Sequence, residues 1–215
     1  MSVRFQLYQF PVFEDDFVSR FLEEISHFEQ SGLECPRPNT MNNRGVLLDD
    51  IGFEPFFDTL RDQYLQKLAA SAFPTLCGSG LDSHRAFTVS YDLNQDRSLG
   101  FHYDNAEVTM NISLSDDFED GDLYFCDMRS TPLQTMQCRP VKHRRGWGIL
   151  HRGQQLHGAL PISSGQRHNL IIWMRSSSVR NKLCPMCDSK PELIPADCGY
   201  GDGFTEETVN VCNAL

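Results

Sequence analysis

Three side chains in the central part of the sequence have the types and spacing of a metal site. His102 and Asp104 are separated by one residue, and His157 follows later in the chain. Two imidazoles and one carboxylate form a facial triad that suits Fe(II) and leaves open positions for a cosubstrate and oxygen. Residues i and i+2 of an extended strand point to the same side, so a strand would direct His102 and Asp104 toward one ion. The pattern predicts an Fe(II) site that His157 completes from another strand.

A fourth residue, Arg167, follows His157 in a segment with strand-like alternation. The alternation places one set of residues on the same face: Arg167, Asn169, Ile171 and Trp173. If this face lines the metal cavity, the Arg167 guanidinium can bind a carboxylate through two parallel hydrogen bonds. We therefore expect Arg167 to hold a dicarboxylic cosubstrate.

Each of these residues also has an ordinary structural interpretation. His102 and Asp104 could form a surface pair in a turn, because polar residues are common on loops. His157 could be a core histidine, and Arg167 could be a surface cation. The combination of all four in register favours the metal site. We expect the other histidines of this region to lie outside that site: His143, His151 and His168.

The stretch from Tyr91 to Trp173 resembles the catalytic domain of 2-oxoglutarate- and Fe(II)-dependent dioxygenases of the prolyl and lysyl hydroxylase type. Over nearly its whole length the chain resembles the 2-oxoglutarate and iron-dependent oxygenase domain-containing proteins, in segments that include Phe10–Phe13, Arg37–Asn43 and Leu183–Cys187. The resemblance implies a mainly β fold with helices (α+β), whose core is a double-stranded β-helix, or jelly roll.

The resemblance also implies a reaction and its cofactors. Fe(II) would be bound by His102, Asp104 and His157, and Arg167 would anchor 2-oxoglutarate. The expected reaction hydroxylates a C–H bond with O₂ and releases succinate and CO₂, and ascorbate would reduce iron that is oxidised in uncoupled turnovers. Many collagen-type prolyl hydroxylases have Lys at the anchor, so Arg is closer to the lysyl hydroxylase pattern. Tyr91 is a candidate cosubstrate contact, with simple packing as the alternative.

Two other functions stay open at this point. One is a catalytically idle jelly roll that acts as a binding or scaffold protein, although such a protein has no physical need for all four residues. The other is a different cupin-type metal enzyme, such as an isomerase, which would not need Arg167. The primary substrate cannot be read from the sequence, and a protein side chain is one candidate.

We expect one domain with three regions. Residues 1–82 form an N-terminal helical and loop region packed on the barrel, residues 83–178 form the jelly-roll core, and residues 179–215 form a cysteine-containing tail. The first region contains a helix capped by Asp15 or Asp16 and a second helix that starts at Pro55. The apolar face predicted for the second helix consists of Phe56, Phe57, Leu60, Tyr64, Leu65 and Leu68.

The segments between and after the helices are expected to be a long loop, strands and turns. Residues 36–50 form an ordered loop that is either a lid beside the iron or a polar connector. Residues 108–114 alternate as a half-buried strand. Residues 116–121 form an acidic turn, and residues 163–165 form another turn. Further strands are expected at residues 87–91, 123–125 and 135–141.

Charge and composition restrict the partners. The chain has 19 basic and 29 acidic residues and a net charge of −10, which would repel a nucleic acid. The dense basic cluster, Arg139 and Lys142–Arg145, is expected to be a solvated hairpin or, less favoured, a local nucleic-acid patch. No apolar run suits a signal peptide or a membrane span, so we expect an intracellular protein, cytoplasmic or nuclear, that does not contact a membrane. The oligomeric state cannot be inferred.

The eight cysteines are expected to be reduced thiols or metal ligands rather than disulfides. Cys184 and Cys187 form a Cys-x-x-Cys motif, with Cys198 and Cys212 downstream. Four thiolates could bind zinc in a tetrahedral site, although the spacing fits a zinc knuckle only loosely. The alternative is four ordinary thiols.

Overall fold

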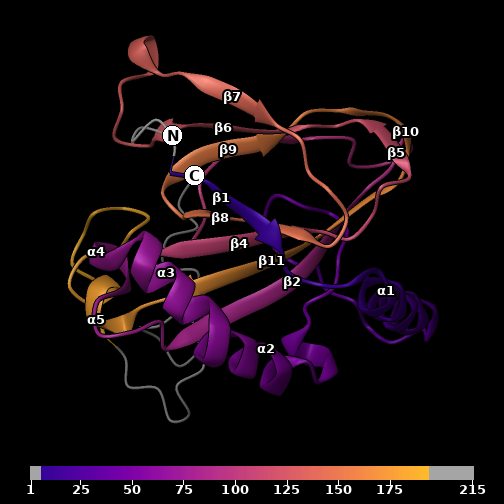
Figure 1. Cartoon of the computed structure of the whole chain (residues 1–215), viewed down its shortest axis with the longest axis horizontal. Helices are drawn as coiled ribbons and strands as arrows, with labels where there is room; N and C mark the ends of the chain where they lie inside the picture. The colour runs from indigo at the N-terminus through magenta and orange to yellow at the C-terminus, as the bar shows by residue number, and fades with distance from the viewer. Residues whose placement is uncertain (1–5, 194–215) are drawn as a thin grey trace.

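The structure is a computed structural model that describes residues 6–193. Two antiparallel sheets face each other, and helices cover the outer face of the larger sheet (Figure 1). The larger sheet has the strand order β1-β8-β4-β11-β2, and the smaller has the order β3-β9-β6-β7. A separate two-stranded sheet pairs β10 with β5. The predicted mainly β class with helices is confirmed.

The strands of the larger sheet are β1 (Tyr8–Pro11), β2 (Ser83–Tyr91), β4 (Val108–Ser113), β8 (Trp147–Arg152) and β11 (Arg167–Arg175). Those of the smaller sheet are β3 (Leu99–His102), β6 (Leu123–Met128), β7 (Cys138–Val141) and β9 (Gln155–Ala159). The short pair consists of β5 (Phe118–Asp120) and β10 (Ile162–Gly165).

The α-helices are α1 (Asp15–Gln30), α2 (Glu54–Leu60), α3 (Gln66–Ala72), α4 (Pro74–Cys77) and α5 (Ser177–Arg180). A π-helical turn, η2 (Arg61–Leu65), joins α2 to α3, and two 3₁₀ turns are η1 (Asp49–Ile51) and η3 (Leu133–Thr135). No helix in residues 6–193 is long and apolar enough to cross a membrane.

The alternation of β11 explains why the protein has two cores. Leu170, Ile172 and Met174 face the helices and pack in one hydrophobic core with Val18 of α1 and Phe57 of α2. The residues between them face the smaller sheet, and Ile171 packs in the second core with Phe125 and Ile149. β11 therefore presents its polar residues, Arg167 and Asn169, to the space between the sheets, as predicted.

Several local predictions are corrected. Strand β1 precedes the helices and pairs with β8. Helix α1 has Glu14 as its N-cap without a side-chain bond, while Asp15 and Asp16 lie in the first turn, where negative charge favours the helix dipole. The acidic segment contains strand β5 rather than a turn, and residues 163–165 belong to its partner strand β10. The two strands pair because each satisfies the backbone hydrogen-bonding groups on the edge of the other.

The apolar face of the second helical segment is also different from the prediction. Phe57 and Leu65 are buried, but Phe56, Tyr64 and Leu68 are exposed at the surface. The buried positions are Phe57, Arg61, Leu65 and Ala69, four residues apart. A regular α-helix has 3.6 residues per turn, so such a series would drift around it. The wider π turn of η2 keeps these positions on one face.

Cys126 of β6 and Cys138 of β7 form a disulfide, so the prediction of reduced or metal-bound cysteines is wrong for this pair. The two residues are direct cross-strand partners. Their proximity depends on the pairing register of two strands, which the cysteine spacing does not reveal.

Candidate active site

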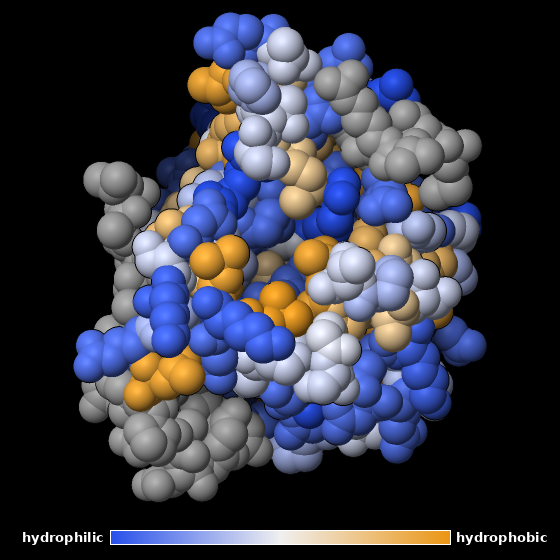
Figure 2. All heavy atoms as spheres, turned by 90° about the vertical axis from the view of Figure 1, so that its left-hand side faces the viewer, coloured by the Kyte–Doolittle hydropathy of each residue, from blue (hydrophilic) through white to orange (hydrophobic). Residues whose placement is uncertain are grey.

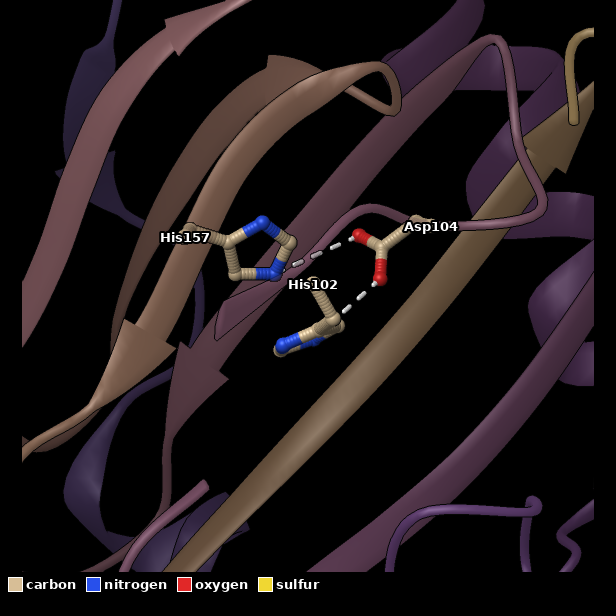
Figure 3. Close-up of side chains that lie close together, drawn as sticks. All are labelled: His102, Asp104 and His157. Atoms are coloured by element: carbon tan, nitrogen blue, oxygen red, sulfur yellow. Dashed lines mark ion pairs between the residues drawn. The ribbon is translucent and has the colours of Figure 1, made fainter. Parts of the chain in front are cut away.

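His102, Asp104 and His157 lie together between the two sheets (Figure 3). One potential ligand atom from each residue lies within 4.8 Å of the others. The Nε2 atom of His102 is 3.8 Å from Asp104 Oδ1, and His157 Nε2 is 3.7 Å from Asp104 Oδ2. The two histidines are cross-strand partners in β3 and β9. The antiparallel pairing therefore brings the sequence-distant histidine to the other two residues.

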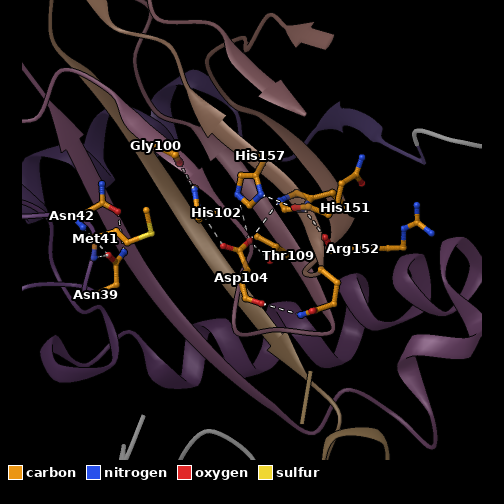
Figure 4. Close-up of polar contacts among 12 residues, drawn as sticks. Asn39, Met41, Asn42, Gly100, His102, Asp104, Thr109, His151, Arg152 and His157 are labelled. Atoms are coloured by element: carbon orange, nitrogen blue, oxygen red, sulfur yellow. Dashed lines mark hydrogen bonds and ion pairs between the residues drawn. The ribbon is translucent and has the colours of Figure 1, made fainter. Parts of the chain in front are cut away.

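Backbone contacts orient both imidazole rings. Nδ1 of His102 lies 2.8 Å from the Gly100 carbonyl oxygen, and Nδ1 of His157 lies 2.9 Å from the Gln155 carbonyl oxygen (Figure 4). A carbonyl oxygen can only accept, so each Nδ1 carries a proton, which in a neutral ring leaves the lone pair on Nε2. Both lone pairs face the space beside the carboxylate, which is the protonation state that a metal ligand needs.

Asp104 is placed by tertiary contacts rather than by strand alternation. Strand β3 ends at His102, so the geometric reason given from the sequence is wrong for Asp104. Its backbone N–H donates to Gly153 O at 2.8 Å, and its Oδ2 accepts a 2.7 Å hydrogen bond from the Thr109 hydroxyl. A Cβ at Gly153 would overlap the Ala106 carbonyl oxygen. A glycine is therefore needed where the turn after β8 approaches the Asp104 loop.

His151 also lies in the site, although we expected it outside. Its Nε2 is 3.8 Å from Asp104 Oδ2, and its ring packs edge-on against His157 with centroids 4.7 Å apart. The His151 side chain is fully buried, and within residues 6–193 its Nε2 has no hydrogen-bond partner. His151 is the cross-strand partner of Thr109. Both residues therefore shield and support the Asp104 carboxylate from one side.

The electrostatics favour neutral imidazoles around an ionised carboxylate. Burial, together with the neighbouring His157, lowers the pKa of His102 to about 4 and that of His151 to about 3. Burial raises the pKa of Asp104, but the surrounding histidines and the Thr109 hydroxyl outweigh burial, so the net pKa is below its usual value. At neutral pH the site therefore offers nitrogen lone pairs and one negative charge, which suits a divalent cation.

Arg167 is a buried cation with hydrogen-bond donors to spare. Its side chain donates from Nε to Asn169 Oδ1 at 2.8 Å and from Nη1 to Gly121 O at 2.7 Å. Nη2 donates no hydrogen bond within residues 6–193, and no carboxylate there forms an ion pair with the guanidinium. Burial lowers the pKa of Arg167, because desolvation of the guanidinium disfavours its charged form. An anionic ligand would remove that cost.

Tyr91 lies beside Arg167, opposite it in the β2–β11 pairing. The guanidinium carbon lies 5.3 Å from the centre of the Tyr91 ring. Tyr91 Oη accepts a 3.2 Å hydrogen bond from Asn42 Nδ2, and in the described part of the chain its own proton has no acceptor. Burial raises the pKa of Tyr91, so the hydroxyl stays a donor at neutral pH. Arg167 and Tyr91 thus present donors to the same space.

One cavity of about 490 Å³ contains the His-Asp-His cluster, Arg167 and Tyr91. This volume is in the range of small-molecule sites. Residues 39–42 line the cavity. The long loop of residues 36–50 therefore forms part of the wall of the site and is not only a polar connector. Met41 and Phe101 line the cavity and are also exposed, so the cavity reaches the surface. In Figure 2 the surface is hollowed near the centre of the face shown, where apolar and polar side chains meet.

Of the remaining histidines and the basic cluster, some residues contact the site and others lie at the surface. His168 faces away from the cavity, as expected, and its Nδ1 lies 2.9 Å from Ser90 Oγ. His143 instead reaches Asn169, with Nδ1 3.1 Å from Asn169 Nδ2. Arg145 donates to Leu114 O at 2.8 Å. The solvated-hairpin prediction is therefore wrong for His143 and Arg145, while Lys142 is exposed as predicted.

The Cys-x-x-Cys segment lies beside the mouth of the cavity. Met186 lines the cavity, and its carbonyl accepts a 3.2 Å hydrogen bond from the Tyr103 hydroxyl. Cys184 is buried and Cys187 is exposed. Cys198 and Cys212 lie outside the described residues, so four-thiolate zinc binding stays a prediction.

Sequence reasoning missed Thr109 and Asn111 because their side of β4 was taken as solvent-facing. All six residues of β4 are buried, since one face packs on the helices and the other lines the cavity. A signal was present in the sequence. The polar side of this strand carries only short uncharged residues, Thr109, Asn111 and Ser113, whereas an exposed strand face usually includes charged side chains.

Comparison with known proteins agrees with this geometry. Residues 2–78 match the family model described as an OGFOD2-like domain. The chain is 52% identical over 204 residues to the 2-oxoglutarate and iron-dependent oxygenase domain-containing protein 2 of Danio rerio, a match that covers 94% of this chain and 59% of that relative. The chain thus spans about three-fifths of the length of the curated relatives it matches.

Two solved structures show the same fold. The epimerase SnoN in complex with Fe³⁺, alpha ketoglutarate and nogalamycin RO superposes with a TM-score of 0.59 at 13% identity, over 81% of this chain and 80% of that one. A Pseudomonas putida prolyl-4-hydroxylase superposes with a TM-score of 0.54 at 16% identity, over 80% of this chain and 93% of that one. The predicted jelly-roll core is confirmed. The chain is therefore similar in sequence to 2-oxoglutarate and iron-dependent oxygenase domain-containing proteins, and it shares the fold of a solved prolyl-4-hydroxylase.

Proposed function

We propose that this chain is the catalytic part of a 2-oxoglutarate- and Fe(II)-dependent dioxygenase that hydroxylates a C–H bond. The observation that carries the proposal is one cavity holding both a His-Asp-His cluster and a buried arginine without a counter-ion among residues 6–193. Either feature alone would suit several kinds of binding site. Their combination fits a ligand that chelates a metal at one end and carries a carboxylate at the other.

The residues divide into two groups with separate tasks. His102 and His157 offer Nε2 lone pairs, and Asp104 supplies the negative charge, so these three would hold Fe(II). Arg167 would bind the distal carboxylate of 2-oxoglutarate through its unused donors, and the Tyr91 hydroxyl would donate to the same cosubstrate. When both groups are bound, the chemistry expected of the family is hydroxylation by O₂ coupled to decarboxylation of 2-oxoglutarate to succinate and CO₂. Ascorbate is the expected reductant of iron oxidised in uncoupled turnovers.

Anaerobic titration with Fe(II) and 2-oxoglutarate tests the proposal directly. Chelation of Fe(II) by the cosubstrate should give a charge-transfer absorption band, and the band should be absent without either component. A catalytically idle jelly roll would bind neither component at stoichiometric levels. A different cupin-type metal enzyme would bind Fe(II) but give no band, and that result would contradict the proposal.

A protein side chain is our working hypothesis for the primary substrate. The cavity reaches the surface at Met41 and Phe101, which are 43% and 42% exposed, so a side chain could enter while its backbone stays outside. A trapping screen with an Asp104→Ala variant against peptides and cell extracts tests this class. Capture of a small metabolite in place of a protein would contradict it.

We further propose that the cysteine tail binds zinc separately from the iron site. The support is that Cys184 and Cys187 lie in a turn closed by hydrogen bonds from Cys184 N–H to Ser189 O and from Asp188 N–H to Cys184 O. Protein purified without chelators should contain zinc, and the Cys184→Ser, Cys187→Ser double variant should lack it. Elemental analysis that finds no zinc in the wild type would leave these residues as ordinary thiols.

A further inference from the structure

We infer that Asn169 is a positioning residue that holds the Arg167 guanidinium in the orientation required for the distal carboxylate of 2-oxoglutarate. The inference rests on the proposed function and deepens it. Asn169 follows Arg167 by two residues in β11, so the two side chains share the cavity face of the strand.

The hydrogen bonds of Asn169 define which way its amide points. An arginine can only donate, so the Asn169 oxygen must face Nε of Arg167, 2.8 Å away. The amide nitrogen faces two acceptors on other elements. It lies 2.7 Å from Asn111 Oδ1 on β4 and 3.1 Å from His143 Nδ1 in the segment between β7 and β8. An amide with its oxygen and nitrogen exchanged would place its nitrogen against Nε of Arg167 and its oxygen against Asn111 Oδ1, and both hydrogen bonds would be lost.

His143 can accept this hydrogen bond because its imidazole is neutral. Burial and the nearby Arg167 charge lower the pKa of His143 to about 3. Asn169 is therefore fixed from three directions, by its own strand, by β4 and by the segment before β8. The side chain is 1% exposed, so water does not compete for these contacts.

The consequence for Arg167 is a preset orientation. Nε is bound to Asn169 and Nη1 is bound to Gly121 O, which leaves Nη2 and the second Nη1 proton for a ligand. Two adjacent protons in one plane match the two oxygens of a carboxylate. Without Asn169 the long side chain would have to lose rotamer freedom when the cosubstrate binds, which weakens affinity.

The decisive variant is Asn169→Asp, which keeps the shape but places a carboxylate against the cation. That carboxylate would occupy Arg167 as an internal competitor. We expect the Kd for 2-oxoglutarate to rise about 100-fold or more, on the scale of losing a buried charge pair. Asn169→Ser retains an oxygen but shortens the side chain, and we expect about a tenfold rise, on the scale of one hydrogen bond to a charged group.

The measurement is calorimetric titration of protein loaded with Mn(II), so that no turnover occurs. Two ligands are compared, 2-oxoglutarate and oxalate, because oxalate can chelate the metal but has no distal carboxylate to reach Arg167. The inference requires weaker 2-oxoglutarate binding with oxalate and Mn(II) affinities unchanged within about threefold, the scatter expected when no contact is lost. Equal loss of both ligands would show a general structural role and would overturn the inference.

Asn111→Asp is the matched control, since it adds the same charge to the same cavity wall. Its carboxylate can still accept from the Asn169 amide, so the contact with Arg167 is retained. We expect at most about a tenfold effect on 2-oxoglutarate, because the added charge has no direct contact with the cation. A loss as large as that of Asn169→Asp would overturn the inference. Failure of the wild type to bind 2-oxoglutarate would instead refute the proposed function.

Discussion

Replacement of Arg167 by alanine separates a 2-oxoglutarate enzyme from any other use of the same metal site. The side chain is 2% exposed, and no carboxylate in residues 6–193 pairs with it. A cosubstrate carboxylate that enters this cavity loses its hydration, and only a paired cation makes that transfer favourable. Arg167→Ala should therefore weaken 2-oxoglutarate binding by about 3 kcal/mol or more, which is beyond a hundredfold.

The same substitution should change the stability of the ligand-free protein only slightly. Removal of the guanidinium leaves Gly121 O and Asn169 Oδ1 without their donor, which costs about 1 to 3 kcal/mol for each buried group. It also removes a buried charge with which no carboxylate of residues 6–193 forms an ion pair, and this offsets part of that cost. We expect the net change in unfolding free energy to stay below about 2 kcal/mol. Loss of cosubstrate binding would then not be a consequence of unfolding.

The assay is titration of 2-oxoglutarate at fixed Fe(II) under anaerobic conditions, followed by the charge-transfer band. Arg167→Lys should give an intermediate affinity, because it keeps the charge but loses the planar fork. Iron affinity should be unchanged in both variants. Equal 2-oxoglutarate affinity in wild type and Arg167→Ala would refute the assigned role.

Arg85→Ala is the matched control for the removal of a cationic side chain from this cavity. Arg85 lines the cavity and is the cross-strand partner of Trp173 in the pairing of β2 with β11. Tyr91 is the cross-strand partner of Arg167 at the other end of the same two strands. At 3.3 Å per residue, six residues along β2 separate Arg85 from Tyr91 by about 20 Å. We expect Arg85→Ala to leave 2-oxoglutarate affinity nearly unchanged. A loss equal to that of Arg167→Ala would indicate a general effect of cavity charge.

Three further predictions concern the metal site and its surroundings. Asp104→Ala should abolish stoichiometric iron binding while the fold survives, because it removes the only anionic residue of the His-Asp-His cluster. Elemental analysis measures the iron, and a thermal melt measures the fold. Retained iron with full turnover would contradict this prediction. Thr109→Val should lower iron affinity about 10- to 100-fold, since it removes the hydroxyl that orients the Asp104 carboxylate. Thr88→Val is the control, because the Thr88 hydroxyl is buried and accepts from Val46 N–H, and this variant should leave iron affinity unchanged. The metal-free protein should lose stability as the pH falls below about 6.5, because His143 and His151 have folded pKa values of about 3 and the unfolded chain takes up their protons first. The loss should be about 2 kcal/mol per histidine between pH 6.5 and 5, and equal urea-unfolding free energies at pH 7 and pH 5 would contradict it.

The sequence by itself determined the chemical types in the site and the faces of its strands. A period of two along β11 separates Arg167 and Asn169 from Leu170 and Ile172, and the structure places these two sets on opposite sides of the sheet. The helix that the sequence predicted after a cap at Asp15 or Asp16 is likewise present as α1. These features are local, because side-chain direction in a helix or strand follows from the backbone geometry of adjacent residues.

Only the tertiary structure decided which strands meet and in which register. The pairing of β3 with β9 sets His102 opposite His157, and the pairing of β4 with β8 sets Thr109 opposite His151. The same kind of pairing joined Cys126 to Cys138 and made the polar face of β4 a cavity wall. A shift of one residue would turn each side chain to the other face, while the local pattern of each strand would stay the same. Register is set by packing between segments that are distant in sequence, and for that reason His151 and Thr109 could be assigned to the site only from the fold.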